Sequence, residues 1–340
     1  MLSYKSRMEN TLPSANVLLY SVIAMFYGWI LSSWPNEYFR DRSNYILYAN
    51  IFDEVTDRYT SVSVFFNEPL FVFYNYILSF FFTPEQIPQI GVFFIASTFA
   101  YFILRYAHSY LMIIVGFSFL FFISYTFHLQ LVVLRQGIAT ALLLWLTYFF
   151  FEKRYFLVLV FILSFLHSSF FIISFILIYE KSLSVFIKKV ELKIIVFSST
   201  LFLLGFFILK IANSLGVRQA EGDYLSKAEA GGGGFILFGF IFMFLYFRGI
   251  DNVEKNRFGK IALLGVISYL ALYFTLPVSG RLIGTFLPFY YIYVISYFNS
   301  KVHFSAYTLF VISFILFGAS ITAGSLTDLG AEKFYSILSF

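Results

Sequence analysis

The chain has 340 residues, of which 60% are hydrophobic and 12% are charged, and its formal net charge is +5. Soluble domains carry about 25% charged residues, so a large soluble domain is excluded. Since cysteine is absent, disulfides, iron–sulfur clusters and thiol nucleophiles are excluded as well. We therefore predict an all-α, polytopic integral membrane protein with about 10–12 transmembrane or re-entrant helices plus amphipathic surface helices.

The first predicted span covers Leu12 to Leu31, close to the twenty or so apolar residues that cross a bilayer. This apolar run is too long for a signal-peptide core, so we expect it to be retained. Residues 32–86 are predicted to form an outer-face loop. Within it, apolar residues recur at helical spacing around Tyr45, which indicates a surface helix. Glu68–Phe82 covers only about 22 Å as a helix, so an interfacial or re-entrant helix is favoured over a span.

Later apolar runs predict spans at Ile87–Leu104, Tyr110–Phe127, Leu129–Phe151, Leu192–Ile211, Phe235–Phe247, Ile261–Leu276, Leu282–Tyr297 and Phe304–Ala319. Residues 152–180 hold His167 at their centre and are predicted to form a broken helix or hairpin. Residues 213–234 are predicted to be an outer-face polar loop ending in a glycine linker. All of these segments are assigned to one membrane domain, residues 1–340.

The distribution of basic residues predicts the orientation. We place the N-terminus in the cytoplasm, keep Glu68–Phe82 from crossing and fold Tyr155–Tyr179 as a hairpin. The cytoplasmic side then holds about 14 of the 23 basic residues and about 6 of the 18 acids, as the positive-inside rule requires.

Three ionisable residues fall in one outer layer in this topology. Arg135 lies about two turns below the outer surface, Arg281 opens a late span, and His167 is at the hairpin tip. A charge held among membrane side chains costs at least about 2.5–3.5 kcal/mol, which favours a functional role. Four further residues face the same compartment: Asp41, Glu68, Arg218 and Tyr224.

Two arginines near a bilayer face are suited to a pyrophosphate whose lipid tail stays in the membrane, because guanidinium groups bind phosphate oxygens bidentately. His167 is suited to take a proton from a sugar hydroxyl. The pattern predicts glycosyl transfer from a lipid-diphosphate donor, with no metal and no cofactor. Simpler interpretations remain open: both arginines as interfacial anchors, His167 as a packing residue, and Glu68 as part of a helix-start signal.

The chain resembles the EpsG-like branch of the Wzy-type polysaccharide polymerases, which make O-antigen, capsule or exopolysaccharide. Four motifs carry the resemblance: Asp41-Arg42-Ser43-Asn44-Tyr45, Glu68-Pro69-Leu70-Phe71, Arg135-Gln136-Gly137-Ile138-Ala139 and Phe165-Leu166-His167-Ser168-Ser169. A fifth, Arg281-Leu282, is a weaker match. Leu166 and Ser169 depart from the family pattern.

The resemblance implies that a growing glycan is transferred from undecaprenyl diphosphate to an undecaprenyl-diphosphate-linked repeat unit, on the outer face of the bacterial inner (cytoplasmic) membrane. The related O-antigen ligases imply catalytic roles for Arg135, Arg281 and His167. Asp41 or Glu68 is the alternative base, because both face outward and a carboxylate can accept a proton. Seven residues are expected to bind substrate: Asp41, Tyr45, Glu68, Gln136, Ser168, Arg218 and Tyr224. The expected partners are the lipid-linked oligosaccharide, the bilayer and a chain-length regulator, with no nucleic acid.

The main competing function is that of a flippase or transporter of lipid-linked oligosaccharides. A transporter favours charges at the membrane midplane and internal repeats, and neither pattern is evident here. The sequence also leaves open a membrane acyltransferase and a non-enzymatic assembly partner.

Overall fold

The computed structural model describes residues 14–39, 41–50, 67–214, 233–247, 249–276 and 279–296. Over these residues the chain forms fourteen α-helices and two short 3-10 helices, and it has no strand. The predicted all-α class is confirmed. Five of the helices are α2 (Ser14–Ser32), α7 (Gln86–Tyr106), α8 (Tyr110–Phe122), α9 (Ser124–Leu131) and α10 (Leu134–Phe150). The remaining helices are η1 (Asn36–Tyr38), α3 (Arg42–Asn50), α6 (Pro69–Ser79), α11 (Phe156–Ile162), η2 (Leu163–Phe165), α12 (Ser169–Phe186), α13 (Val190–Ser214), α15 (Gly233–Phe247), α16 (Ile250–Lys255), α17 (Arg257–Leu272) and α18 (Ser279–Ser296).

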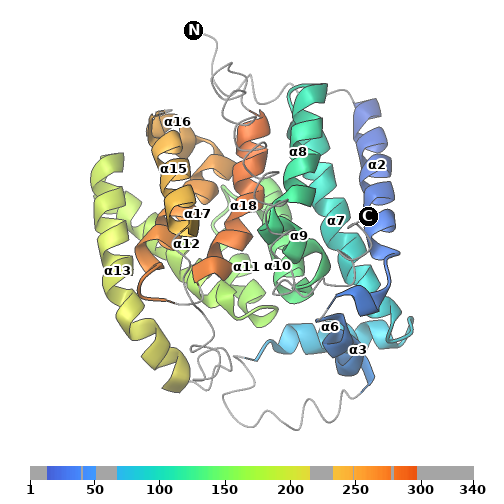
Figure 1. The fold of residues 1–340 in the computed structure, drawn as a ribbon. Coiled ribbons are helices and arrows are strands. Elements are labelled where there is room, and N and C mark those ends of the chain that lie inside the picture. The colour runs from blue at the N-terminus through green and yellow to red at the C-terminus, as the bar shows by residue number, and fades with distance from the viewer. Residues whose placement is uncertain are drawn as a thin grey trace.

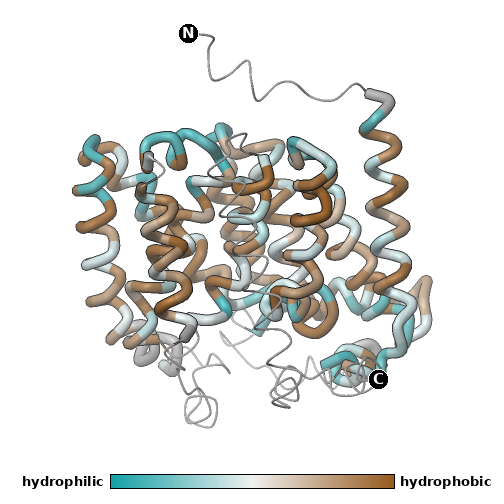
Figure 2. Tube along the Cα trace, turned by 45° about the horizontal axis from the view of Figure 1, so that its top comes forward, coloured by the Kyte–Doolittle hydropathy of each residue, from teal (hydrophilic) through white to brown (hydrophobic). Residues whose placement is uncertain are grey.

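Most of the long helices lie side by side and run between two ends of the molecule (Figure 1). Apolar residues fill the band between these ends, and polar residues gather at its two edges (Figure 2). Among the described helices, α7, α12 and α13 are each long and apolar enough to cross a membrane, and the bent pair α8–α9 qualifies as one more span. Large apolar side chains such as Leu18 and Trp29 of α2 are exposed on the outside, as lipid-facing residues are. The chain is therefore a helical membrane protein.

The two ends of the bundle differ in the residues that hold them together. At the first end, Arg257 donates to the carbonyl of Tyr148 at 2.7 Å and to the hydroxyl of Tyr106 at 3.0 Å. This end, here called the Arg257 end, joins α7, α10 and α17. The opposite end carries α3 and α6, and is called the Glu68 end after the residue that precedes α6 (Figure 1).

Helix α6 belongs to the Glu68 end and does not cross the bundle. Its eleven residues cover about 16 Å, roughly half of the hydrocarbon thickness. It packs against α3, whose surface position was expected from the spacing of its apolar residues. The rest of that predicted surface helix, beyond Asn50, and the predicted span Phe304–Ala319 lie outside the described residues.

The region between α8 and α10 differs from the prediction. Tyr110–Phe127 and Leu129–Phe151 were expected as two spans, but α8 and α9 meet at a 72° bend and α10 begins only at Leu134. Gln130 stabilises the bend because its Nε2 donates to the carbonyl of Leu120 at 2.8 Å, near the end of α8, where helical partners run out. Arg135 is consequently the second residue of α10, and does not lie two turns inside a longer helix.

A second break separates α11 from α12. The segment Phe156–Phe165, formed by α11 and η2, is ten residues long, and the chain turns at Leu166–Ser168 before α12 starts at Ser169. Helices α11 and α12 then pack against each other. His167 therefore lies at the tip of a helical hairpin, at the Glu68 end.

Candidate functional site

Glu68 has an unusual backbone conformation. Its φ of 63° and ψ of 50° place it in the left-handed region, and it is the single non-glycine residue with positive φ among those described. This conformation is costly for a residue with a Cβ, and such outliers gather at functional sites. Glu68 occupies the N-cap of α6, but its side chain makes no capping hydrogen bond to that helix. The helix-start interpretation therefore does not account for the carboxylate.

The Glu68 carboxylate instead joins α6 to two distant helices. Its Oε2 forms an ion pair with Nη1 of Arg135, at the start of α10. Its Oε1 accepts from the backbone N–H of Ser168 at 3.1 Å and from the Ser168 hydroxyl at 3.4 Å, and it lies 3.9 Å from Nε2 of His167. The structure thus brings together four residues from three of the sequence motifs, and these four are called the Glu68 cluster.

Arg135 is the accessible member of the Glu68 cluster. Its side chain is 29% exposed, whereas the side chains of Glu68 and His167 are 4% and 3% exposed. Its Cζ lies 5.8–5.9 Å from the ring centroids of Tyr45, Tyr48 and Phe71, which form an aromatic wall beside the guanidinium. Its Nε is buried and has no hydrogen-bond partner among the described residues. Glu68 therefore does not use all the donors of Arg135, and an arriving anion can contact the exposed part of the guanidinium.

Helix α3 holds the start of α10 in place. The hydroxyl of Tyr45 accepts from the N–H of Leu134 at 3.1 Å, and Nε of Arg42 donates to the carbonyl of Leu131 at 3.1 Å. These are backbone groups that the break between α9 and α10 leaves without helical partners. Tyr45 is only 2% exposed, so its ring offers no open face for a sugar, and its contacts position Arg135.

The fully buried Arg42 was not singled out from the sequence, although it lies inside the first motif. Asp41, next to Arg42, is partly exposed.

The imidazole of His167 is oriented by the residue two positions later. The backbone N–H of Ser169 donates to Nδ1 at 3.2 Å, and the Ser169 hydroxyl lies 2.8 Å from the same nitrogen. Because Nδ1 accepts a hydrogen bond, the proton of the neutral ring lies on Nε2, which faces Glu68.

Gln136 links Arg281 to the cluster. Its Nε2 donates to the carbonyl of Arg281 at 2.5 Å and to the hydroxyl of Thr285 at 2.9 Å. These bonds hold the start of α18 against α10, and Gln136 itself is buried. The charge of Arg281 acts electrostatically on His167 together with that of Arg135. Gln136 therefore positions the backbone of Arg281. Its motif did not predict these contacts, because Arg281 and Thr285 lie far away in the chain.

Four residues of the site lie at or next to helix N-termini. Glu68 precedes α6, Arg135 is in the first turn of α10, Ser168 precedes α12, and Arg281 is the third residue of α18. The N-terminus of a helix carries a partial positive charge and unpaired N–H groups, which favour an anion. Four such termini meet at the Glu68 end, and the described residues include no group of three His, Cys, Asp or Glu side chains suited to a metal. Arg218 and Tyr224, the remaining predicted binding residues, lie outside the described residues.

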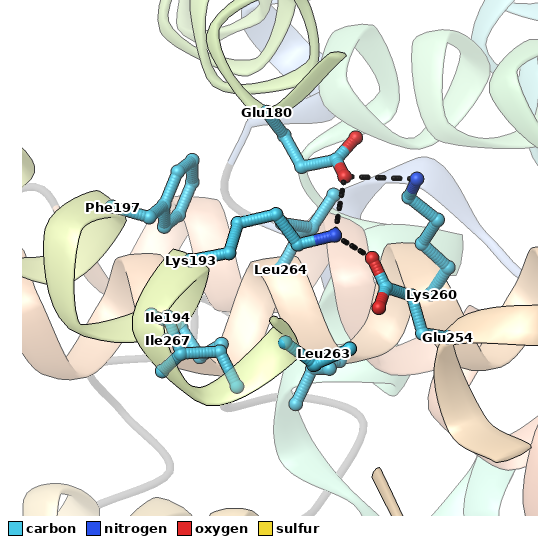
Figure 3. A pocket seen from close by; sticks show the side chains of 10 residues that line it. Glu180, Lys193, Ile194, Phe197, Glu254, Lys260, Leu263, Leu264 and Ile267 are labelled. Carbon is cyan, nitrogen blue, oxygen red and sulfur yellow. Dashed lines mark hydrogen bonds and ion pairs between the residues drawn. The ribbon is translucent and has the colours of Figure 1, made fainter. Parts of the chain in front are cut away.

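A second group of charges, two of them buried and two half-buried, lies on helices next to Arg257. Figure 3 shows this group from close by. Nζ of Lys193 contacts Oε1 of Glu180 at 3.2 Å and forms an ion pair with Glu254, and Nζ of Lys260 contacts Oε1 of Glu180 at 2.9 Å. These four residues, here the Glu180 cluster, join α12, α13, α16 and α17. They border a cavity of about 20 Å³, with room for roughly one water molecule. The positive-inside rule assigns Lys193 and Lys260 to the cytoplasmic side, but it does not predict that they are paired with carboxylates.

Comparison with known proteins supports the family resemblance. The EpsG family matches residues 9–336, nearly the whole chain. Searches of the curated proteins and of the solved structures with this chain found no match. The resemblance inferred from the five motifs is therefore confirmed.

Proposed function

Because the chain belongs to the EpsG family of polymerase-like membrane glycosyltransferases, we propose that it is a polysaccharide polymerase. It transfers a growing glycan from undecaprenyl diphosphate to a fresh undecaprenyl-diphosphate-linked repeat unit. The reaction takes place on the outer face of the bacterial inner membrane, and the N-terminus is cytoplasmic.

The observation that carries this proposal is the setting of Arg135. A partly exposed guanidinium stands at a helix N-terminus beside aromatic rings, and the next residue, Gln136, binds the backbone carbonyl of Arg281. A lipid diphosphate has the matching chemistry, because its phosphates need fixed positive charge and its tail needs an apolar surface. In this proposal, Arg135 and Arg281 bind the diphosphate and stabilise it as it leaves. The acceptor hydroxyl gives its proton to a base at the Glu68 end, for which His167, Glu68 and Asp41 are the candidates.

The lipid-linked products that accumulate in a deletion strain test this function. We expect single repeat units on undecaprenyl diphosphate to accumulate on the outer face, with long polymer absent. Repeat units accumulating on the cytoplasmic face would favour the flippase instead. Unchanged polymer with altered acylation would favour the acyltransferase. A chain-length regulator is a further expected partner. Its co-purification with this protein tests that expectation.

The orientation has its own test, because the chain contains no native cysteine. Single cysteines placed at Glu152 and Gly222 should react with a membrane-impermeant maleimide from opposite sides of the membrane. Reaction from the same side contradicts the proposed topology.

A further inference from the structure

We propose that Glu68 is the base of the transfer, and that the donor activates it by drawing Arg135 away from it. Before the donor binds, Arg135 is paired with Glu68. When the diphosphate binds, Arg135 turns to its oxygens and leaves the carboxylate free to take the acceptor proton. This inference rests on the proposed function, and it makes donor binding a condition for base catalysis.

The hydrogen bonds of His167 argue against the imidazole as the base. A neutral imidazole has one lone pair for a proton, and here that lone pair is on Nδ1. The N–H of Ser169 donates to Nδ1 at 3.2 Å, and the Ser169 hydroxyl is closer still, at 2.8 Å. Nε2 carries the ring proton and faces Oε1 of Glu68 at 3.9 Å, which is longer than a hydrogen bond. His167 therefore directs an N–H toward Glu68 without being available as a base, which makes it a positioning residue.

The carboxylate of Glu68 can provide a free lone pair for a proton, which the imidazole of His167 cannot. An ionised carboxylate accepts at about four lone-pair positions, and three contacts from Ser168 and Arg135 account for those within hydrogen-bond distance. Departure of Arg135 frees Oε2, whereas Ser168 continues to hold Oε1. Asp41 makes none of these contacts among the described residues, so it is the weaker carboxylate candidate.

The exposed fractions show which member of the ion pair an anion can reach. The side chain of Arg135 is 29% exposed and that of Glu68 is 4% exposed. An arriving diphosphate can therefore contact the guanidinium before it contacts the carboxylate. Its charges compete with a single carboxylate for the guanidinium, whose buried Nε has no hydrogen-bond partner while Arg135 is bonded to Glu68.

The chemical step balances without any additional reactant. The O–H bond of the acceptor sugar breaks and its proton passes to Oε2 of Glu68. The acceptor oxygen forms a bond with the anomeric carbon of the growing glycan, and the bond from that carbon to the phosphate oxygen breaks. Undecaprenyl diphosphate leaves with the electron pair, and Arg135 and Arg281 face its new charge. Glu68 then loses its proton to water and pairs with Arg135 again.

Binding of undecaprenyl diphosphate to the purified full chain in nanodiscs, measured beside polymer synthesis, tests the proposal. Glu68→Gln should bind the diphosphate about tenfold more tightly, because no carboxylate competes for Arg135. The same variant should lose about 10²–10⁴-fold in transfer rate, the usual contribution of a general base. Glu191→Gln, an exposed glutamate on α13, is the matched control and should change neither quantity.

His167 variants separate the two candidate bases. An asparagine side chain donates an N–H but takes no proton at neutral pH. His167→Asn should therefore keep about a tenth of the wild-type rate, well above His167→Ala, with diphosphate affinity unchanged. If His167→Asn is as inactive as His167→Ala while Glu68→Gln still makes polymer, His167 is the base and the proposal is wrong.

The remaining outcomes distinguish this inference from the function beneath it. If the wild-type chain does not bind undecaprenyl diphosphate, the proposed function fails. If it binds, and Glu68→Gln binds with the same affinity, the function stands and the switch is refuted. Should Glu68→Gln fold poorly, Glu68→Asp keeps the charge but withdraws the carboxylate. This variant should bind the diphosphate more tightly than wild type and transfer more slowly, and wild-type values for both overturn the proposal.

Discussion

The Glu68 cluster and the Glu180 cluster hold buried charges at opposite ends of one bundle, and they differ in how completely those charges are paired. In the Glu180 cluster, two carboxylates meet two lysines, and Ser184 adds hydrogen bonds to Glu180 at 2.6 Å and from Lys193 at 3.1 Å. In the Glu68 cluster, one carboxylate serves Arg135, His167 and Ser168, and Arg135 retains an unpaired Nε and an exposed side.

This difference separates a structural charge cluster from a candidate reactive one. In a buried ion network whose members all have partners, removal of one partner leaves an unpaired buried charge and lowers stability. A site that binds an anion must instead have positive charge and hydrogen-bond donors that are not fully used by the protein itself. The Glu180 cluster therefore predicts effects on stability, and the Glu68 cluster predicts effects on transfer.

The largest effect is expected for Arg135→Ala. Loss of the guanidinium removes the proposed contact to the leaving diphosphate, so transfer should fall by about 10³-fold or more, measured as long polymer per molecule of protein. Single lipid-linked repeats should remain on the outer face. Since this variant leaves Glu68 without a cation, the double variant Arg135→Ala/Glu68→Gln serves as the folding control and should remain inactive. Arg154→Ala, at an exposed arginine, should behave as wild type.

Lys193→Met tests the other side of the comparison. It removes the lysine shared by Glu180 and Glu254, so the free energy of unfolding should fall by about 3–5 kcal/mol. Thermal unfolding followed by tryptophan fluorescence measures this loss. Polymer made per folded molecule should not change, and a large loss there would contradict a purely structural role. Lys189→Met, at an exposed lysine, is the control.

Gly137→Val probes the packing that places Arg135. A Cβ at Gly137 would collide with the carbonyl oxygen of Leu129 and with Ile95 Cδ1, so α10 must move away from α9. Overpacking of this kind costs about 1–3 kcal/mol and should lower transfer about tenfold by displacing Arg135. Gly239→Val, where a Cβ meets nothing within 4 Å, is the matched control on α15. Equal loss in both variants would point to a general effect on helix stability.

The smallest effect is expected for Gln136→Ala. It removes two hydrogen bonds that fasten Arg281 and Thr285 to α10, worth about 1 kcal/mol in stability. Undecaprenyl diphosphate affinity should fall by a few-fold, since Arg281 loses its fixed position. Thr140→Val, which removes only a hydroxyl bonded within α10, should leave that affinity unchanged.

Sequence reasoning reached the helical membrane class and the family because both rest on composition and on local motifs. It missed the break before α10, because the groups that stabilise the break come from Arg42 and Tyr45, far away in the chain. For the same reason, Tyr45 and Gln136 were expected to bind substrate, whereas their contacts hold helices in place. The Glu180 cluster could not be predicted from the sequence. A lysine near the end of a membrane helix stands in the same sequence pattern whether its charge is paired with a carboxylate or solvated.

The four helix N-termini at the Glu68 end have a consequence for the response to ionic strength. Their positive potential adds to the charge of Arg135, which is partly exposed. Mobile ions that reach this end of the bundle screen both the dipoles and that charge. Binding of a diphosphate at the Glu68 end should therefore weaken as the salt concentration rises.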